Sequence, residues 1–270
     1  TPLYSSAASD VYKRQVSGGF CNTASGVATT ISGGYKNFAQ GNNSTIGGGI
    51  CNRICCITAL NCSAGATIAG GVGNNSIGGI WTSSSGYFTV APTTLLAAGQ
   101  LSTISGGFQN RGTGTASVIG GGFCNISSAE CTTVGGGGCN TASVYRATVA
   151  GGFSNTASGA GSTIAGGLVN TASGNQSTLG GGITNTASGN CSFVGGGQCN
   201  TANSTWSSIG GGRGNTSSSS YSFVGAGLSN TASGPRSTIG GGQSNLASCN
   251  WSVVAGGLSN TSSGYLSGVV

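Results

Sequence analysis

One aliphatic residue recurs every fifteen residues through most of the chain, and this fixed step limits the folds that the sequence can adopt. Around Ile164 the repeated unit runs from Ser162 to Gln176 and reads Ser-Thr-Ile-Ala-Gly-Gly-Leu-Val-Asn-Thr-Ala-Ser-Gly-Asn-Gln. In the regular part of the chain, the aliphatic column consists of Ile104, Ile119, Val134, Val149, Ile164, Leu179, Val194, Ile209, Val224, Ile239 and Val254. A short repeat with a fixed period indicates a solenoid or an array, in which each unit packs on its neighbours.

Each half of the unit has the side-chain period of a strand, because apolar and polar residues alternate there. In the first half we expect Ser162 and Ile164 to point inward, with Thr163 facing out. In the second half we expect Asn170 and Ala172 to point inward. Glycines supply the positive φ values of the corners. The sequence therefore predicts an all-β fold, a parallel β-solenoid or β-roll of about fifteen-residue coils with two short strands per coil and glycine-rich turns.

An asparagine follows each aliphatic residue by six positions, and stacked side-chain amides bond to one another along such a column. This predicted ladder consists of Asn110, Asn125, Asn140, Asn155, Asn170, Asn185, Asn200, Asn215, Asn230, Asn245 and Asn260. A helical alternative fails because glycine costs about 1 kcal/mol at each helical position. Disorder, the other alternative for a chain rich in Gly and Ser, is opposed by the strict aliphatic column and by a charged fraction of only 4%.

The predicted organisation has three segments. Residues 1–15 share nothing with the repeat and resemble translated adapter sequence, so we expect a non-native or disordered tract. Residues 16–102 are predicted to be a solenoid with two irregular excursions rich in cysteine and aromatic residues, either loops that cover exposed core or a local binding or capping element. Residues 103–270 are predicted to be a regular solenoid that stops inside a unit, as expected of a fragment truncated at its C-terminus.

The two excursions interrupt the fifteen-residue step. The first, Cys51–Cys62, lengthens one coil and places the next aliphatic centre at Ile68. The second is expected to be another long coil, which passes Trp81 and leads to Val90.

Composition argues against catalysis. The chain has no histidine, and its only acids are Asp10 and Glu130. Paired-carboxylate chemistry, a Ser–His–Asp triad and a His or carboxylate metal cage all lack their parts, so we expect no enzyme, no catalytic residue, no metal and no cofactor. The formal charge of +6 is spread over single residues, which does not support a nucleic-acid partner. No apolar stretch reaches the roughly eighteen residues of a membrane span.

Eleven cysteines indicate an oxidising compartment. Cys124 and Cys139 occupy the same column in adjacent coils, about 4.8 Å apart, and form the candidate disulfide. Free cysteines that act as small filler residues are the alternative, with a metal site at Cys51–Cys62 a third interpretation.

The unit Gly-x-x-Ser-Thr-Ile-Ala-Gly from Gly159 onward, with its following Asn-Thr-Ala-Ser-Gly, resembles the head repeat of trimeric autotransporter adhesins. Similar repeats occur in phage and viral tail-fibre-like proteins. The resemblance implies a β-roll of three associated chains that binds host or matrix surfaces. This sequence departs from the family in its slightly longer units, its many cysteines, and the lack of a recognisable coiled-coil stalk, neck or membrane anchor.

Two functions are consistent with these features. The first is a non-enzymatic extracellular fibre module, structural or adhesive, on a cell or virion surface. Its partners would be copies of itself, as a homotrimer or filament, and a host surface, matrix or glycan. The alternative is ice binding through outward hydroxyl rows, interrupted at Asn203, Ser217–Ser220 and Leu246. The candidate outward face consists of Thr141, Ser143, Thr156, Ser158, Thr171, Ser173, Thr186 and Ser188.

Overall fold

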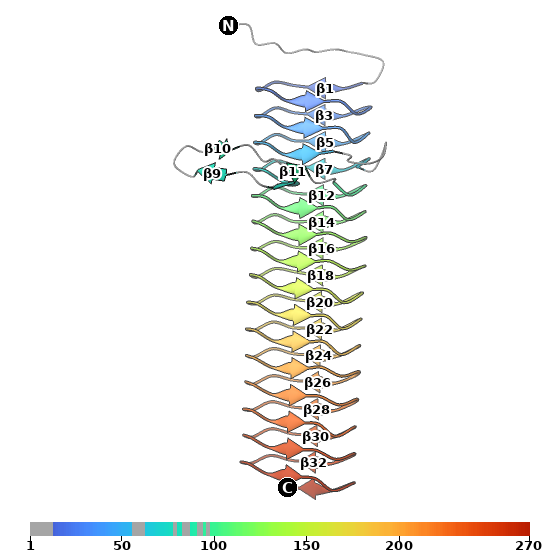
Figure 1. The fold of residues 1–270 in the computed structure, drawn as a ribbon, viewed down its shortest axis with the longest axis vertical. Coiled ribbons are helices and arrows are strands. Elements are labelled where there is room, and N and C mark those ends of the chain that lie inside the picture. The colour runs from blue at the N-terminus through green and yellow to red at the C-terminus, as the bar shows by residue number, and fades with distance from the viewer. Residues whose placement is uncertain (1–12, 56–62, 78–79, 83–86, 91–93, 96–97) are drawn as a thin grey trace. The chain divides into compact units, whose positions relative to one another are not determined.

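The computed structural model describes residues 13–55, 63–77, 80–82, 87–90, 94–95 and 98–270. The chain divides into two compact units, residues 1–139 and 140–270, which are described separately. Every element in the described ranges is a β-strand, and within each unit the coils stack through parallel pairs of short strands (Figure 1). The predicted all-β parallel solenoid, with two short strands per coil, is confirmed. Most of the tract 1–15, together with Cys56 and Cys62, lies outside the described residues.

Residues 140–270 form the regular unit. One row of parallel strands contains β18 (Thr148–Val149), β20 (Thr163–Ile164), β22 (Thr178–Leu179), β24 (Phe193–Val194), β26 (Ser208–Ile209), β28 (Phe223–Val224), β30 (Thr238–Ile239), β32 (Val253–Val254) and β34 (Gly268–Val269). The other row contains β17 (Thr141–Ala142), β19 (Thr156–Ala157), β21 (Thr171–Ala172), β23 (Thr186–Ala187), β25 (Thr201–Ala202), β27 (Thr216–Ser217), β29 (Thr231–Ala232), β31 (Leu246–Ala247) and β33 (Thr261–Ser262). Equivalent residues pair directly, as Ile164 does with Leu179.

Residues 13–139 use the same scheme with one interruption. The main row contains β1 (Gln15–Val16), β3 (Thr30–Ile31), β5 (Thr45–Ile46), β7 (Thr67–Ile68), β12 (Thr103–Ile104), β14 (Val118–Ile119) and β16 (Thr133–Val134). The second row is split into β2 (Thr23–Ala24), β4 (Phe38–Ala39) and β6 (Arg53–Ile54), followed by β13 (Arg111–Gly112) and β15 (Ile126–Ser127).

The second excursion does not form the long coil that the sequence predicts. Four strands, β8 (Ser76–Ile77), β9 (Ile80–Thr82), β10 (Tyr87–Val90) and β11 (Thr94–Leu95), pair antiparallel, β10 with β9 and β11 with β8. Val90 pairs with Ile80 rather than with an aliphatic centre, while Ile104 pairs directly with Ile68. Antiparallel strands need only a short turn, whereas another parallel coil needs a full circuit of chain. Figure 1 shows β9 and β10 to one side of the coils of this unit.

The core of each coil is one aliphatic side chain with small neighbours. Every residue of the aliphatic column from Ile104 to Val254 is fully buried. Ser162 and Ala172 are also buried in the coil of Ile164. Where the second strand carries Ser217 in place of alanine, its hydroxyl pairs with that of Ser222 at 2.6 Å. Because a buried aliphatic side chain contributes only about 1.5–3 kcal/mol, backbone bonding between coils must supply much of the stability.

Asparagines of the ladder tie each corner to the coils on both sides. The Asn185 N–H donates to Oδ1 of Asn170 at 2.9 Å, and Oδ1 of Asn185 accepts from the Asn200 N–H at 2.9 Å. Nδ2 of Asn185 donates to the carbonyl oxygens of Gly181 at 3.0 Å and Gly197 at 2.8 Å. The ladder from Asn110 to Asn245 is buried, and Asn260 is half-buried. One side chain thus satisfies backbone groups of a corner that has only an isolated bridge to the next coil, such as that of Ile183 with Gln198.

Two non-strand positions in each coil adopt the left-handed conformation without needing glycine. The Asn tip is the residue before each ladder asparagine, and the far tip is the sixth residue after it. In the coil of Ile164 these are Val169, at φ +56°, and Gln176, at φ +55°. The Val169 N–H donates to the Phe153 carbonyl at 2.9 Å, and the Gln176 N–H to the Ala160 carbonyl at 2.8 Å. This conformation is uncommon for a β-branched residue, so hydrogen bonds to the preceding coil hold it.

Candidate binding surfaces

The predicted hydroxyl face lies on the outside of the second strand row in residues 140–270. Thr141, Thr156, Thr171 and Thr186 are half-buried and pair in register. Ser143 and Ser158 are half-buried, whereas Ser173 and Ser188 are exposed. The structure therefore brings this set together as two neighbouring rows.

This threonine row is longer than the sequence analysis recognised. Thr201, Thr216 and Thr231 continue it in register. The interruption expected at Ser217–Ser220 falls on other positions of the coil, so the row first breaks at Leu246. Counting fifteen residues onward from Thr186 would have found all three.

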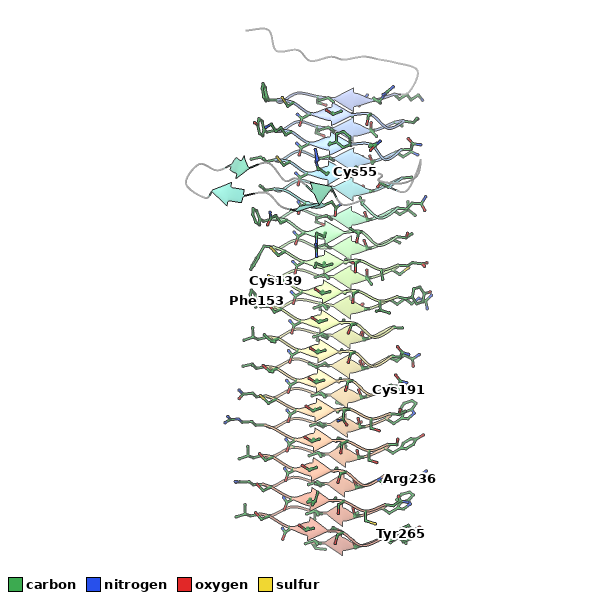
Figure 2. The ribbon with its side chains drawn as sticks, in the orientation of Figure 1. Cys55, Cys139, Phe153, Cys191, Arg236 and Tyr265 are labelled. Carbon is green, nitrogen blue, oxygen red and sulfur yellow. The ribbon has the colours of Figure 1, made fainter. Side chains whose placement is uncertain are left out.

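The two tips of residues 140–270 carry different side chains on opposite sides of the coils. Figure 2 shows Cys191, Arg236 and Tyr265 on one side and Phe153 on the other. Beside the Asn tip, Phe153, Leu168 and Ile183 are linked by parallel bridges. These three side chains are 45%, 41% and 44% exposed, which makes an apolar row along this side.

At the far tip, four large side chains occupy successive coils. Trp206 and Tyr221 stack with ring centroids 6.4 Å apart and an interplanar angle of 9°. The guanidinium carbon of Arg236 lies 5.6 Å from the Tyr221 ring centroid and 5.1 Å from that of Trp251. Sequence analysis missed this aromatic–arginine row, although the fifteen-residue spacing of the four residues was a visible signal. Exposed arginine–aromatic contacts contribute about 0.5–1 kcal/mol each.

Cys124 and Cys139, the candidate disulfide, occupy the Asn tip of adjacent coils, and the structure holds both thiols free. Burial raises the pKa of the Cys124 thiol, and the charge and hydrogen bond of Cys139 raise it further. The two thiols are therefore close enough to interact, while the disulfide stays a prediction.

In the part of the chain that the structure describes, no three His, Cys, Asp or Glu side chains lie close enough together to hold a metal ion. The same residues include no helix of the length and apolarity that a membrane crossing requires.

Stacked parallel coils, a buried aliphatic column and outward rows of repeated side chains define a β-solenoid repeat module. A sequence model for the family described as the ubiquitous surface protein adhesin repeat matches residues 147–159. That segment contains β18, the Asn155 corner and β19. No curated protein matches the chain. The short match and the solenoid together suggest a repetitive adhesive or structural module, and a non-enzymatic one.

Proposed function

We propose that the chain is a non-enzymatic adhesive and structural module of an extracellular fibre, displayed on a cell or virion surface. The observation that carries this proposal is the adhesin-repeat match at residues 147–159, which covers most of one coil. The same coil geometry recurs through residues 140–270, so the matched segment is one of many equivalent units. Repeated units offer the many parallel contacts that strengthen attachment to a surface without any single tight site.

Self-association is part of this proposal, and the apolar row of Phe153, Leu168 and Ile183 is the surface that favours it. Contiguous exposed apolar groups of this kind are typical of protein–protein contacts. The resemblance to trimeric adhesins makes a homotrimer the expected state, with a host surface, matrix or glycan as its partner.

Light scattering after size exclusion tests the assembly. We expect three times the chain mass for the wild type and a lower mass for a Leu168→Gln, Ile183→Gln variant. Glutamine already occupies this column at Gln198 and Gln243, so the variant should keep its fold. A wild type that is monomeric at every concentration contradicts the trimer. Retention of the chain on matrix-coated surfaces, compared with a heat-unfolded sample, tests adhesion separately.

Ice binding is a second candidate, favoured by the unbroken row of threonines from Thr141 to Thr231 on parallel strands. Such a row presents hydroxyl and methyl groups at about the 4.8 Å strand spacing. Thermal hysteresis with faceted ice crystals would support this function, and Thr186→Leu should then reduce the hysteresis. Thr178→Phe is the matched control, because Phe193 and Phe223 occupy that column of the other strand row. No hysteresis at high concentration rejects this candidate.

A further inference from the structure

The Arg236 side chain is held between two aromatic rings at the far tip. Tyr221 lies on one side and Trp251 on the other, and Trp206 extends the stack beyond Tyr221. The three aromatic side chains are 51%, 55% and 46% exposed for Trp206, Tyr221 and Trp251 respectively. Arg236 is itself exposed, and its guanidinium carries five N–H donors in a planar fork that matches a carboxylate or sulfate.

No acidic side chain competes for this arginine within its own unit. The only acids of the chain are Asp10 and Glu130, whereas residues 140–270 contain Arg146, Arg213 and Arg236. The guanidinium makes ring contacts in the described structure but has no carboxylate partner there. An anion is therefore the complementary ligand, and nothing in this unit neutralises the site beforehand.

The backbone at this tip is also unusual. Elsewhere, an asparagine at the position before the far tip accepts from the preceding coil, as Asn175 Oδ1 does from the Ala160 N–H at 3.2 Å. Asn250 occupies that position before Trp251, but the preceding coil has Pro235 there, which has no N–H. The Asn250 Oδ1 atom is accordingly buried without a hydrogen-bond partner. The coil therefore lacks the bond between this asparagine oxygen and the preceding coil, and it lacks that bond at Pro235, the residue that fixes the backbone directly before Arg236.

The surroundings select a saccharide rather than a nucleic acid. Nucleic-acid bases bind exposed ring faces by stacking, but the faces of Tyr221 that point along the row are covered by Trp206 and Arg236. Beside Tyr221 lie its own hydroxyl group and the half-buried side chains of Ser204 and Ser220, whose hydroxyl oxygens are 3.5 Å apart. Hydroxyl groups and exposed tryptophan rings beside an arginine fork complement the hydroxyl groups, C–H faces and anionic group of an acidic sugar.

We propose that Trp206, Tyr221, Arg236 and Trp251 form a binding site for a carboxylated or sulfated saccharide chain. The inference rests on the proposed adhesive function and names the chemical class of its partner. Arg236 holds the anionic group through its in-plane donors, and the flanking rings keep the guanidinium oriented. The site lies on the tips and shares no residue with the threonine row.

The test measures binding of the full chain to immobilised polysaccharides. Hyaluronate carries carboxylates, heparin adds sulfate groups, and dextran is neutral. Single-stranded polyadenylate and polyglutamate represent the other polyanions. We expect binding to hyaluronate or heparin, with the pair identifying the preferred anionic group, and none to dextran.

Matched variants locate the site. Arg236→Gln should weaken binding about tenfold, and Trp251→Leu should weaken it less, because only one ring is lost. Gln176 and Leu266 already occupy the far-tip column in the left-handed conformation, so both variants should fold. Arg213→Gln removes the same charge beside the Asn tip, where Gln198 is the neighbour, and should leave binding unchanged. Arg236→Lys should also bind weakly, since an ammonium has no planar fork.

Several results would overturn the site. Equal losses in Arg213→Gln and Arg236→Gln would show general charge attraction, and wild-type affinity in Arg236→Lys would show that the fork does not matter. Arg236-dependent binding to polyadenylate or polyglutamate as strong as to the saccharides would reject the saccharide assignment. If the chain attaches to matrix-coated surfaces but binds no acidic saccharide, this inference fails while the adhesive function stands. If it attaches to neither, both fail.

Discussion

At the scale of single residues, glycine is indispensable at fewer corners than its abundance indicates. Gly167, directly before Leu168, has φ +92°, and a Cβ there would lie 2.2 Å from the Gly182 carbonyl oxygen. Its neighbour Gly166 has open space around the same position. The tips themselves hold the left-handed conformation with Val169 and Gln176. The requirement for glycine therefore comes from the close approach of the next coil as much as from φ.

Gly167→Ala and Gly166→Ala form a matched test of this reading. We expect Gly167→Ala to destabilise the solenoid by about 2 kcal/mol or more, because strain and a backbone clash coincide. Gly166→Ala should change stability by less than about 1 kcal/mol in either direction. Urea unfolding followed by circular dichroism measures both. Equal effects of the two substitutions would contradict the steric assignment.

Sequence periodicity predicted the solenoid, and the structure places the aliphatic and asparagine columns inside it. Both columns follow from the period alone, because each coil gives the same environment to the same position. The tips were not predictable in this way. Their left-handed backbone is held by hydrogen bonds such as that from the Val169 N–H to the Phe153 carbonyl and not set by residue type, so the period aligns Trp206 with Arg236 without showing that both lie at a tip.

At the scale of the corner, the asparagine ladder supplements isolated backbone bridges such as that between Ile183 and Gln198. Its amides satisfy glycine carbonyl groups and the N–H of the next asparagine, as Asn185 does for Asn200. The corner is therefore held in part by side chains, and loss of Asn185 leaves the Asn200 N–H without its acceptor.

Asn185→Ala should destabilise the unit by about 3 kcal/mol or more, since several buried partners lose their bonds at once. Hydrogen exchange at the Asn200 amide should accelerate in the same variant. Asn260→Ala is the control, because Asn260 is half-buried and its side chain donates to the Gly256 carbonyl of its own coil. A similar loss for both positions would argue against the ladder as the main support of the corner.

The paired thiols of Cys124 and Cys139 offer a second test at this scale. Under mild oxidation we expect an intramolecular disulfide between them, found by peptide mapping without reductant. The reactive thiolate is disfavoured because the pKa of Cys124 is raised, so the oxidation rate should keep rising with pH above the ordinary thiol range. Cys124→Ser should abolish the crosslinked peptide. A crosslink of Cys139 to another cysteine in the wild type would refute the pairing.

At the scale of the whole chain, each unit consists of coils that contact only their nearest neighbours. An insertion therefore leaves the stacking unchanged when the chain re-enters the stack at the next coil position. The antiparallel excursion between Ile68 and Ile104 is such an insertion, because these two residues pair directly. Its strand pairing was hidden in the sequence: the period ends there, and short apolar runs do not reveal their partners.

Replacing residues 78–93 by Asn-Gly should therefore preserve folding. Ile77 pairs antiparallel with Thr94, and a two-residue Asn-Gly turn suits that connection. We expect the thermal midpoint to fall by no more than a few degrees. Deleting 163–170 is the contrasting change, since it breaks the step of fifteen and should unfold part of residues 140–270. Unfolding caused by the Asn-Gly replacement would show that the excursion supports the coils.

The tips have a consequence for how such a protein changes over time. Their side chains point away from the core, so valine, glutamine, cysteine, tryptophan and arginine have all been accommodated at equivalent places. A substitution at a tip can thus change the binding surface of one coil without changing the core that holds the fold together. Each coil adds the same rise along the stack. Duplicating a coil between two binding side chains therefore increases the distance between them by one fixed step, and the number of coils sets the spacing of ligand groups that the protein can bind.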